Sequence, residues 1–347
     1  MKRLGWLLLA VVLLVAAAWL MRGGESVDTG PKRTDVHLPR RATPDDVKRM
    51  HRRRTLLPRK PASPDAPPIV EVQDPVLRAL PPRGPGDDAV VVELNAIRHS
   101  PAAEMFLRCM DEDAKQKLQE LRDKFGVDPL QDLDRFVLGP NETVLVSGDF
   151  ADFDTSALDG LKSQASYGDQ GTLLEYADGQ YAATWNDEMV IFADSLEEAQ
   201  GALDRLEGRT PVTESALPES AAYGEAYGYV GPELLARMLP PRDGLEEQLL
   251  AAAQDIELHL DTRSDVGAVF DVRGDDPAAV EELGVMIGAA LSVARIKART
   301  DGDDELSQLL DMAKVIPDGD RFRLEMAVPL DYLRKQLGAC AEPPAAP

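Results

Sequence analysis

Apolar positions after residue 87 alternate in some stretches and recur every three or four residues in others, which predicts a mixture of strands and helices. Strands are predicted at Ala89–Leu94 and Ala222–Val230. Between them, one continuous helix over 107–125 is expected, with a single apolar stripe made of Leu107, Met110, Ala114, Leu118, Leu121 and Phe125.

Short turn sequences divide residues 172–193 into a meander. Asp178-Gly179 and Asn186-Asp187 each separate two apolar runs, and such dipeptides are strong hairpin signals. Ser195 with Glu198 then forms a capping box, which predicts a helix that ends near Gly208.

The second half repeats the order of strand, helices, hairpin, helix, strand and helix. It contains a predicted long helix from Pro277 toward Arg299, a helix over 305–315, a strand over 321–330 and a closing helix over 331–337. We therefore predict an α+β fold with two tandem units, at 87–210 and 211–338. Each is expected to be an antiparallel sheet with helices on one face, similar to a split β-α-β arrangement. If the units are duplicates, 89–94 and 222–230 should each be the first strand of their own sheet.

The N-terminus resembles a membrane signal. Lys2 and Arg3 precede 17 uncharged residues, 5–21, close to the lower limit for spanning a bilayer. A cleavable signal peptide, with small residues at Ala16-Ala17-Ala18, is the alternative. We favour an uncleaved anchor at 1–22, because the apolar run continues past that site. The flanking charges favour a cytoplasmic N-terminus and a periplasmic or other extracytoplasmic body.

Residues 23–86 are predicted to be a disordered linker, and residues 339–347 a disordered tail. The linker is basic first, then Pro-rich, with nine prolines between 58 and 85. Its densest basic point is Arg52, Arg53 and Arg54. These arginines can bind an anionic surface such as phospholipid or an envelope polymer, or can simply belong to a solvated tether, which is the commoner case.

Charge separates the arm from the body. Residues 1–60 contain 14 Lys/Arg and 5 Asp/Glu, whereas residues 87–347 contain 22 and 53, a net charge of −31. Such an acidic body should repel nucleic acid, and no aromatic residue is interleaved with the basic ones, so nucleic acid is not a favoured partner.

Tyr223, Tyr227 and Tyr229 form the best candidate binding surface, since their spacing places them on one face of a strand. The alternative, which we prefer, is an aromatic ladder that packs inside the protein.

Candidate chemistry is otherwise sparse. No nucleophile elbow, Walker loop, dinucleotide fingerprint or zinc-protease motif occurs, so no catalytic residue, cofactor or metal ligand is assigned. His259 alternates with Glu257 and Asp261, and all three are expected on the solvated face of their strand. The apolar stretch 283–294 is too short to span a membrane and is expected to be a helix buried on most sides, with its glycines allowing close approach to a sheet. Cys109 and Cys340 either pair in an oxidising compartment or are unrelated thiols; the second is favoured because Cys340 falls in the predicted tail.

The segment 126–134, Gly-Val-Asp-Pro-Leu-Gln-Asp-Leu-Asp, precedes a strand that ends at Gly148-Asp149-Phe150. This pattern resembles an uncharacterised class of bacterial envelope proteins that have an N-terminal anchor and tandem α+β domains. The resemblance covers the body and implies no activity.

Three functional hypotheses follow. The first is a membrane-anchored envelope protein with a non-catalytic binding or structural role, held in the membrane by residues 5–21 and binding a protein or an anionic envelope polymer. The second is a metal-assisted hydrolase that uses loop carboxylates. The third is a cytoplasm-facing protein whose basic arm binds nucleic acid.

Overall fold

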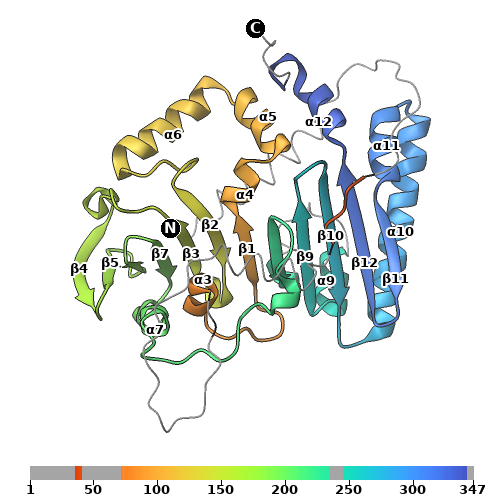
Figure 1. Cartoon of the computed structure of the whole chain (residues 1–347). Coiled ribbons are helices and arrows are strands. Elements are labelled where there is room, and N and C mark those ends of the chain that lie inside the picture. The colour runs from red at the N-terminus through yellow and green to blue at the C-terminus, as the bar shows by residue number, and fades with distance from the viewer. Residues whose placement is uncertain (1–35, 41–71, 73, 235–244, 342–347) are drawn as a thin grey trace. The chain divides into compact units, whose positions relative to one another are not determined.

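The computed structural model of the chain describes residues 36–40, 72, 74–234 and 245–341 (Figure 1). Their contacts group them into two compact units. The central unit holds the described residues of 40–98 and 110–229. The C-terminal unit holds those of 36–39, 99–109 and 230–341. Both are α+β, with antiparallel sheets and helices.

The sheet of the central unit has the strand order β8-β1-β2-β3-β7-β6-β5-β4, and each pair of neighbouring strands is antiparallel. Its strands are β1 (Ala89–Glu93), β2 (Leu133–Leu138), β3 (Val144–Gly148), β4 (Leu161–Tyr167), β5 (Gly171–Tyr176), β6 (Tyr181–Trp185), β7 (Met189–Ala193) and β8 (Ala226–Val230). Its helices are α3 (Pro75–Ala79), α4 (Leu94–Arg98), α6 (Glu112–Phe125) and α7 (Leu196–Leu206), with short 3-10 turns at Pro140–Glu142, Thr155–Ala157 and Glu219–Ala221.

The meander predicted over 172–193 is present as β5, β6 and β7. Asn186 and Asp187 both have a φ of 51°, which is what a tight hairpin turn with left-handed central residues needs. The Ser195 hydroxyl accepts a hydrogen bond from the Glu198 N–H at 3.2 Å, so the predicted N-cap of α7 is confirmed.

A large apolar cluster stabilises the central unit. One side of the sheet contributes Val91, Val137, Leu145 and Ile191, which pack with buried residues of α3 and α7. Val76, Ala79 and Leu80 belong to this cluster, although residues 23–86 were predicted to be disordered linker. Asp74 caps α3, and Arg135 donates two hydrogen bonds of 2.8 and 2.9 Å to the Asp74 carboxylate. The Pro-rich composition hid this short helix, because Pro at its first position starts a helix rather than ending one.

The helix predicted over 107–125 is two helices. α5 (Pro101–Cys109) ends before Asp111, whose side chain accepts a hydrogen bond from the Ala114 N–H at 2.8 Å and so begins α6. None of the residues of α6 is buried, and Leu121 is exposed. The apolar spacing that crossed the break is therefore not one packed stripe, and the two helices fall in different units.

The sheet of the C-terminal unit has the order β11-β12-β10-β9, again antiparallel. Its strands are β9 (Asp255–Asp261), β10 (Val266–Arg273), β11 (Lys314–Asp318) and β12 (Arg321–Val328). Its helices are α5, α9 (Leu245–Ala252), α10 (Pro277–Thr300), α11 (Asp304–Asp311), α12 (Leu330–Leu337) and the 3-10 turn η4 (Gly338–Ala341). β11 was missed because 305–315 was expected to be one helix; α11 ends at Asp311 instead.

Residues of α9 and α10 cover one face of this sheet. Ile256, Val272 and Phe322 face them and join Leu249, Val280 and Leu283 in a second apolar cluster. Gly284 lies directly over Phe322, where an added Cβ would come within 3.1 Å of the ring. This confirms the expectation that glycine in 283–294 permits close approach to a sheet.

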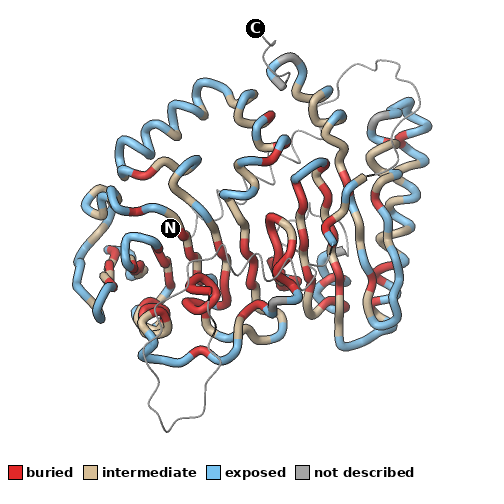
Figure 2. The backbone as a smooth tube through the Cα atoms, in the orientation of Figure 1, coloured by how far each residue is buried: buried red, intermediate tan, exposed pale blue. Residues whose placement is uncertain are grey.

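The rest of the expectation for 283–294 is wrong, because α10 is not buried on most sides. Only Val280, Leu283, Gly284 and Ala298 are buried in this helix (Figure 2). Among the described helices, α10 has the length and apolar composition to cross a membrane, but the core helix of a soluble protein can meet the same criterion. Here its buried residues pack on β-strands, as just described.

The strand placement expected from a duplication is not observed. β1 and β8 were each expected to open a separate sheet, yet they pair with each other, with Ala89 opposite Tyr229 and Val92 opposite Ala226. The similar order of elements in the two halves therefore does not correspond to two equivalent sheets, and the contact-based units differ from the predicted limits of 87–210 and 211–338.

Candidate functional site

The candidate tyrosines lie inside the central unit. Tyr227 is 1% exposed and belongs to the large apolar cluster, and its hydroxyl donates to the Glu93 carboxylate at 2.8 Å. Tyr229 packs against the same cluster, with the Arg83 guanidinium 4.2 Å from the centre of its ring. Tyr223 is also buried, but it precedes β8. These positions favour the packing role over a binding surface.

Gly228 of β8 is constrained by the neighbouring strand. Gly228, with φ 142°, lies so close to the paired strand β1 that an added Cβ would come within 2.0 Å of the Ala89 carbonyl oxygen. The glycine thus permits close strand pairing rather than the packing of a helix against the sheet.

The basic arm and the anchor cannot be placed. Arg52, Arg53, Arg54 and residues 5–21 lie outside the described residues. Within the same region of sequence, however, residues 36–40 are described, and Val36–Pro39 belongs to the C-terminal unit. The disordered linker predicted over 23–86 therefore includes two stretches of the folded body, here and at α3.

Val36–Pro39 lies against β9 and β10. The His37 backbone N–H donates to Asp265 at 3.4 Å, and the His37 Nε2 is 3.8 Å from Asp261 Oδ2. Gly267 on β10 faces the His37 carbonyl, where an added Cβ would come within 2.4 Å. The segment thus occupies the face of the sheet opposite α9 and α10.

That face contains charged residues that are buried. Glu257, His259 and Asp261 alternate along β9 and were expected on its solvated side, but all three are buried. His259, which is 0% exposed, has its Nε2 2.9 Å from Glu257 Oε1. Asp271 on β10 receives two hydrogen bonds from Arg323 on β12, at 2.8 and 2.9 Å. The alternation predicts correctly that these residues share one face of the strand. The expectation that this polar face is exposed to solvent is wrong.

Asp261 is a carboxylate of this face whose pKa is lowered by its surroundings. Burial alone would raise its pKa, but hydrogen bonds from the side chain and backbone of Arg263, with the charges of Arg263 and His37, lower the pKa below its usual value. The ionised carboxylate is therefore the form that the fold favours. Arg263 Nε donates to Asp261 Oδ2 at 3.0 Å.

This polar face does not bring together the groups that the hydrolase hypothesis requires. That hypothesis needs acids from different segments to converge with His99 or His259. The carboxylate nearest to His259 comes from its own strand, and the ring is shielded from solvent. Across the described ranges, no group of three or more His, Cys, Asp or Glu side chains has an arrangement that could hold a metal ion.

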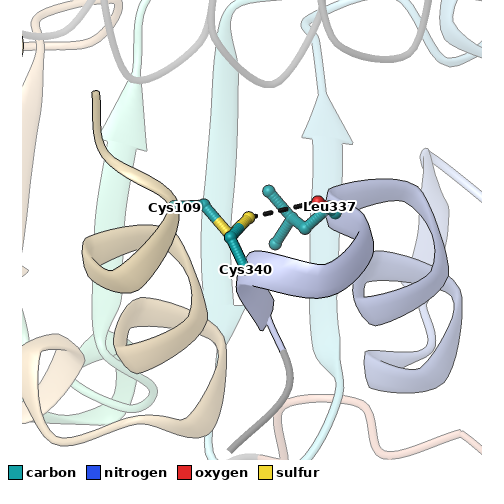
Figure 3. Close-up of a disulfide and its surroundings, with 3 residues drawn as sticks. All are labelled: Cys109, Leu337 and Cys340. Carbon is teal, nitrogen blue, oxygen red and sulfur yellow. Dashed lines mark hydrogen bonds between the residues drawn. A yellow bond between two sulfur atoms is a disulfide. The ribbon is translucent and has the colours of Figure 1, made fainter.

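Cys109 and Cys340 form a disulfide, which corrects the preference for two unrelated thiols. Their Cα atoms are 5.1 Å apart, and the bond joins the end of α5 to η4 (Figure 3). The Cys340 sulfur also lies 3.1 Å from the Leu337 carbonyl oxygen at the end of α12. Cys340 was assigned to the tail because no apolar pattern follows Leu337; only the packing of α5 near α12 reveals the pairing.

Comparisons with known proteins add little to this geometry. No protein-family model matches the chain, and no curated protein matches it. Among solved structures, it is similar to TP0453, in a structure described as crystal form I, with a TM-score of 0.37 and 14% sequence identity. The similarity covers 76% of this chain and 96% of that one. At this level the similarity supports no argument about fold or function.

Proposed function

We propose that the protein is anchored in a membrane by residues 5–21, that its folded part lies outside the cytoplasm, and that its role there is binding or structural rather than catalytic. The observation that supports the location is the Cys109–Cys340 disulfide. Structural disulfides persist in oxidising compartments, whereas cytosolic thiols are kept reduced. The charges at the N-terminus favour the same side of the membrane.

The position of Val36–Pro39 supports a folded part that lies close to the proposed anchor. If the anchor ends at residue 22, only residues 23–35 separate it from a segment that belongs to the C-terminal unit. Thirteen residues span at most about 45 Å even when fully extended. In place of a linker that runs from residue 23 to residue 86, we therefore propose a short connection between the bilayer and the C-terminal unit.

The basic residues then lie in a connection between two folded segments. Arg52, Arg53 and Arg54 fall between residue 40 and residue 72, both of which are described, rather than in a free N-terminal arm. We propose that this connection binds an anionic surface on the same side of the membrane, either phospholipid headgroups or an anionic envelope polymer. The acidic body, with its net charge of −31, would not itself do so.

The location is tested by fusing reporters to the C-terminus of the full chain in a bacterial host. A reporter that is active only in the periplasm should be active, and one that is active only in the cytoplasm should be silent. The matched control is the same fusion with Lys2 and Arg3 replaced by Glu, which should reduce export because the positive end is lost. A silent periplasmic reporter with an active cytoplasmic one would overturn the proposal.

The arm is tested in the full chain by replacing Arg52, Arg53 and Arg54 with Gln and measuring sedimentation with anionic vesicles and with purified envelope polymer. Binding should weaken, and its salt dependence should flatten, because fewer counterions are released. Replacing Arg321, a partly exposed residue at the start of β12, with Gln provides the control. Equal binding by the triple variant and the wild type would show that these arginines only space the chain.

A further inference from the structure

The outward face of α10 carries an apolar stripe, although the protein as a whole is acidic. Val285, Val293 and Ile296 are 63%, 65% and 64% exposed. At 3.6 residues per turn, these three side chains and Ala289 fall within about 80° of one another around the helix. Val280, Leu283, Gly284 and Ala298, the buried residues of α10, lie on the opposite side. The helix is therefore apolar on both faces, and the described part of the chain covers only one.

Charges stand at the two ends of this stripe with opposite signs. Glu281 and Glu282 lie before it, and Lys297 and Arg299 lie after it, all of them exposed. The charges are also symmetric along the sequence: Glu281 and Arg299 are equally far from Ala290, and Glu282 and Lys297 are equally far from the bond between Ala289 and Ala290. A second helix of the same sequence would meet opposite charges at both ends if it ran antiparallel, and like charges if it ran parallel.

We infer that α10 is a self-association surface, on which the same helix of a second copy packs in antiparallel orientation. Such a contact is isologous, since a residue i of one copy meets a residue j of the other while j of the first copy meets i of the second, and it closes at a dimer. Val285, Val293 and Ile296 would be removed from water, and Glu282 of one copy would face Lys297 of the other. Ala289 and Ser292, at the centre of the stripe, are small enough for two helices to approach closely. This inference does not depend on the proposed location.

Internal contacts hold the back of α10 in place, so the stripe is presented by a fixed element. Arg295 donates to the backbone carbonyls of Leu310, at 2.8 Å, and of Ala313. Arg299 donates to both oxygens of Asp311 at 2.9 and 3.0 Å. Because Arg299 already has this partner, Glu282 and Lys297 are the better pair for an experiment.

The test is cross-linking of the purified full chain. Cys109 and Cys340 are joined, so a thiol introduced by Ala289→Cys is the one that a short bismaleimide can link, and native disulfides are not exchanged. A cross-linked dimer should form several-fold more than for Leu121→Cys, an exposed apolar position on α6. In the Ala289→Cys background, Glu282→Lys alone and Lys297→Glu alone should each reduce the dimer. The two together should restore it.

Two results would overturn this inference. The first is a cross-link no stronger than that of the Leu121→Cys control, or one that both single charge reversals leave unchanged. The second is an environment-sensitive dye on Ala289→Cys whose emission shifts with the amount of neutral lipid and not with protein concentration, because the occupant would then be a bilayer. The double charge reversal restores opposite charges across the contact without restoring either original residue. Recovery of the dimer would therefore show that the single variants lost it through charge repulsion and not through misfolding.

Discussion

The central unit takes its described residues from two main stretches of chain and packs them around one large apolar cluster, whereas the C-terminal unit assembles three stretches around a smaller one. The second unit compensates with specific links. A disulfide joins α5 to η4, Val36–Pro39 covers a polar sheet face, and ion pairs connect neighbouring strands. The stability of the C-terminal unit should therefore respond to redox state and pH, while that of the central unit should respond mainly to packing.

The largest effect is expected inside the central cluster. Tyr227→Ala should destabilise the central unit by about 4 kcal/mol, because a fully buried aromatic ring is replaced by a cavity and Glu93 loses a hydrogen-bond donor. Urea unfolding followed by hydrogen exchange in β1 and β2 measures it. Tyr227→Phe, which keeps the ring, is the control and should cost about 1 kcal/mol. If Tyr227→Ala left stability unchanged but weakened a partner, the tyrosines would be a binding surface after all.

The disulfide provides the sharpest contrast between the units. Cys109→Ser with Cys340→Ser should destabilise the C-terminal unit by about 3 kcal/mol, because the unfolded chain regains the freedom that a long closed loop removes. Amide exchange should accelerate in β9 and β10 and stay unchanged in β6 and β7. Equal acceleration in both sets of strands would mean that the two units unfold together, and the comparison would fail.

Two glycines of α10 form a matched pair with smaller effects of opposite sign. Gly284→Ala should destabilise by about 1–2 kcal/mol, because its Cβ would press on the Phe322 ring at 3.1 Å. Gly288→Ala should stabilise by up to about 1 kcal/mol, because its Cβ would meet Val315 at an ordinary 3.9 Å and alanine favours a helix. Thermal melting of both variants measures the difference. The same sign for both would contradict the close approach of α10 to the sheet.

Acid should lower the free energy of unfolding of the C-terminal unit through its polar face, and the effect should be smallest at neutral pH. The folded state lowers the pKa of Asp261, so the stability that the ionised form contributes is present above the usual carboxyl value of 3.8. It is lost as the pH falls below that value through the folded pKa. Asp261→Asn should therefore flatten the acid limb of a stability curve recorded by denaturant unfolding between pH 6 and 2. An acid limb as steep as that of the wild type would show that Asp261 does not contribute.

Local signals predicted much of the fold, and the failures share a physical cause. The Asn186-Asp187 turn and the Ser195 cap were predictable, because a few neighbouring residues determine such structures. The break at Asp111 was missed because apolar spacing ran across it. The burial of Asp261 could not be predicted, since a charged residue on a strand becomes buried only when another part of the chain covers it, and the His37 ring of segment 36–39 lies 3.8 Å from its carboxylate.

The candidate site depended even more on distant contacts. Sequence placed Cys340 in a tail, and 231 residues separate it from Cys109, so no local pattern could reveal the pairing. The tyrosines were found from their spacing, but Tyr227 is buried in a cluster that includes residues of α3, a helix in a region of Pro-rich composition. The charges at the two ends of α10, in contrast, can be read from the sequence alone. Their opposite signs point to a helix–helix contact only once the structure shows that the apolar stripe between them is exposed.

The most direct test of the proposed location is the redox state of Cys109 and Cys340 in cells that express the full chain. Cells are quenched with acid, and free thiols are labelled with a maleimide polymer that retards the protein on a gel. We predict no retardation before reduction and a shift for two thiols after reduction, while Cys109→Ser should give a shift for one thiol without reduction. Two free thiols in the unreduced wild-type chain would contradict an oxidising location, and with it the account of the C-terminal unit as a disulfide-fastened body outside the cytoplasm.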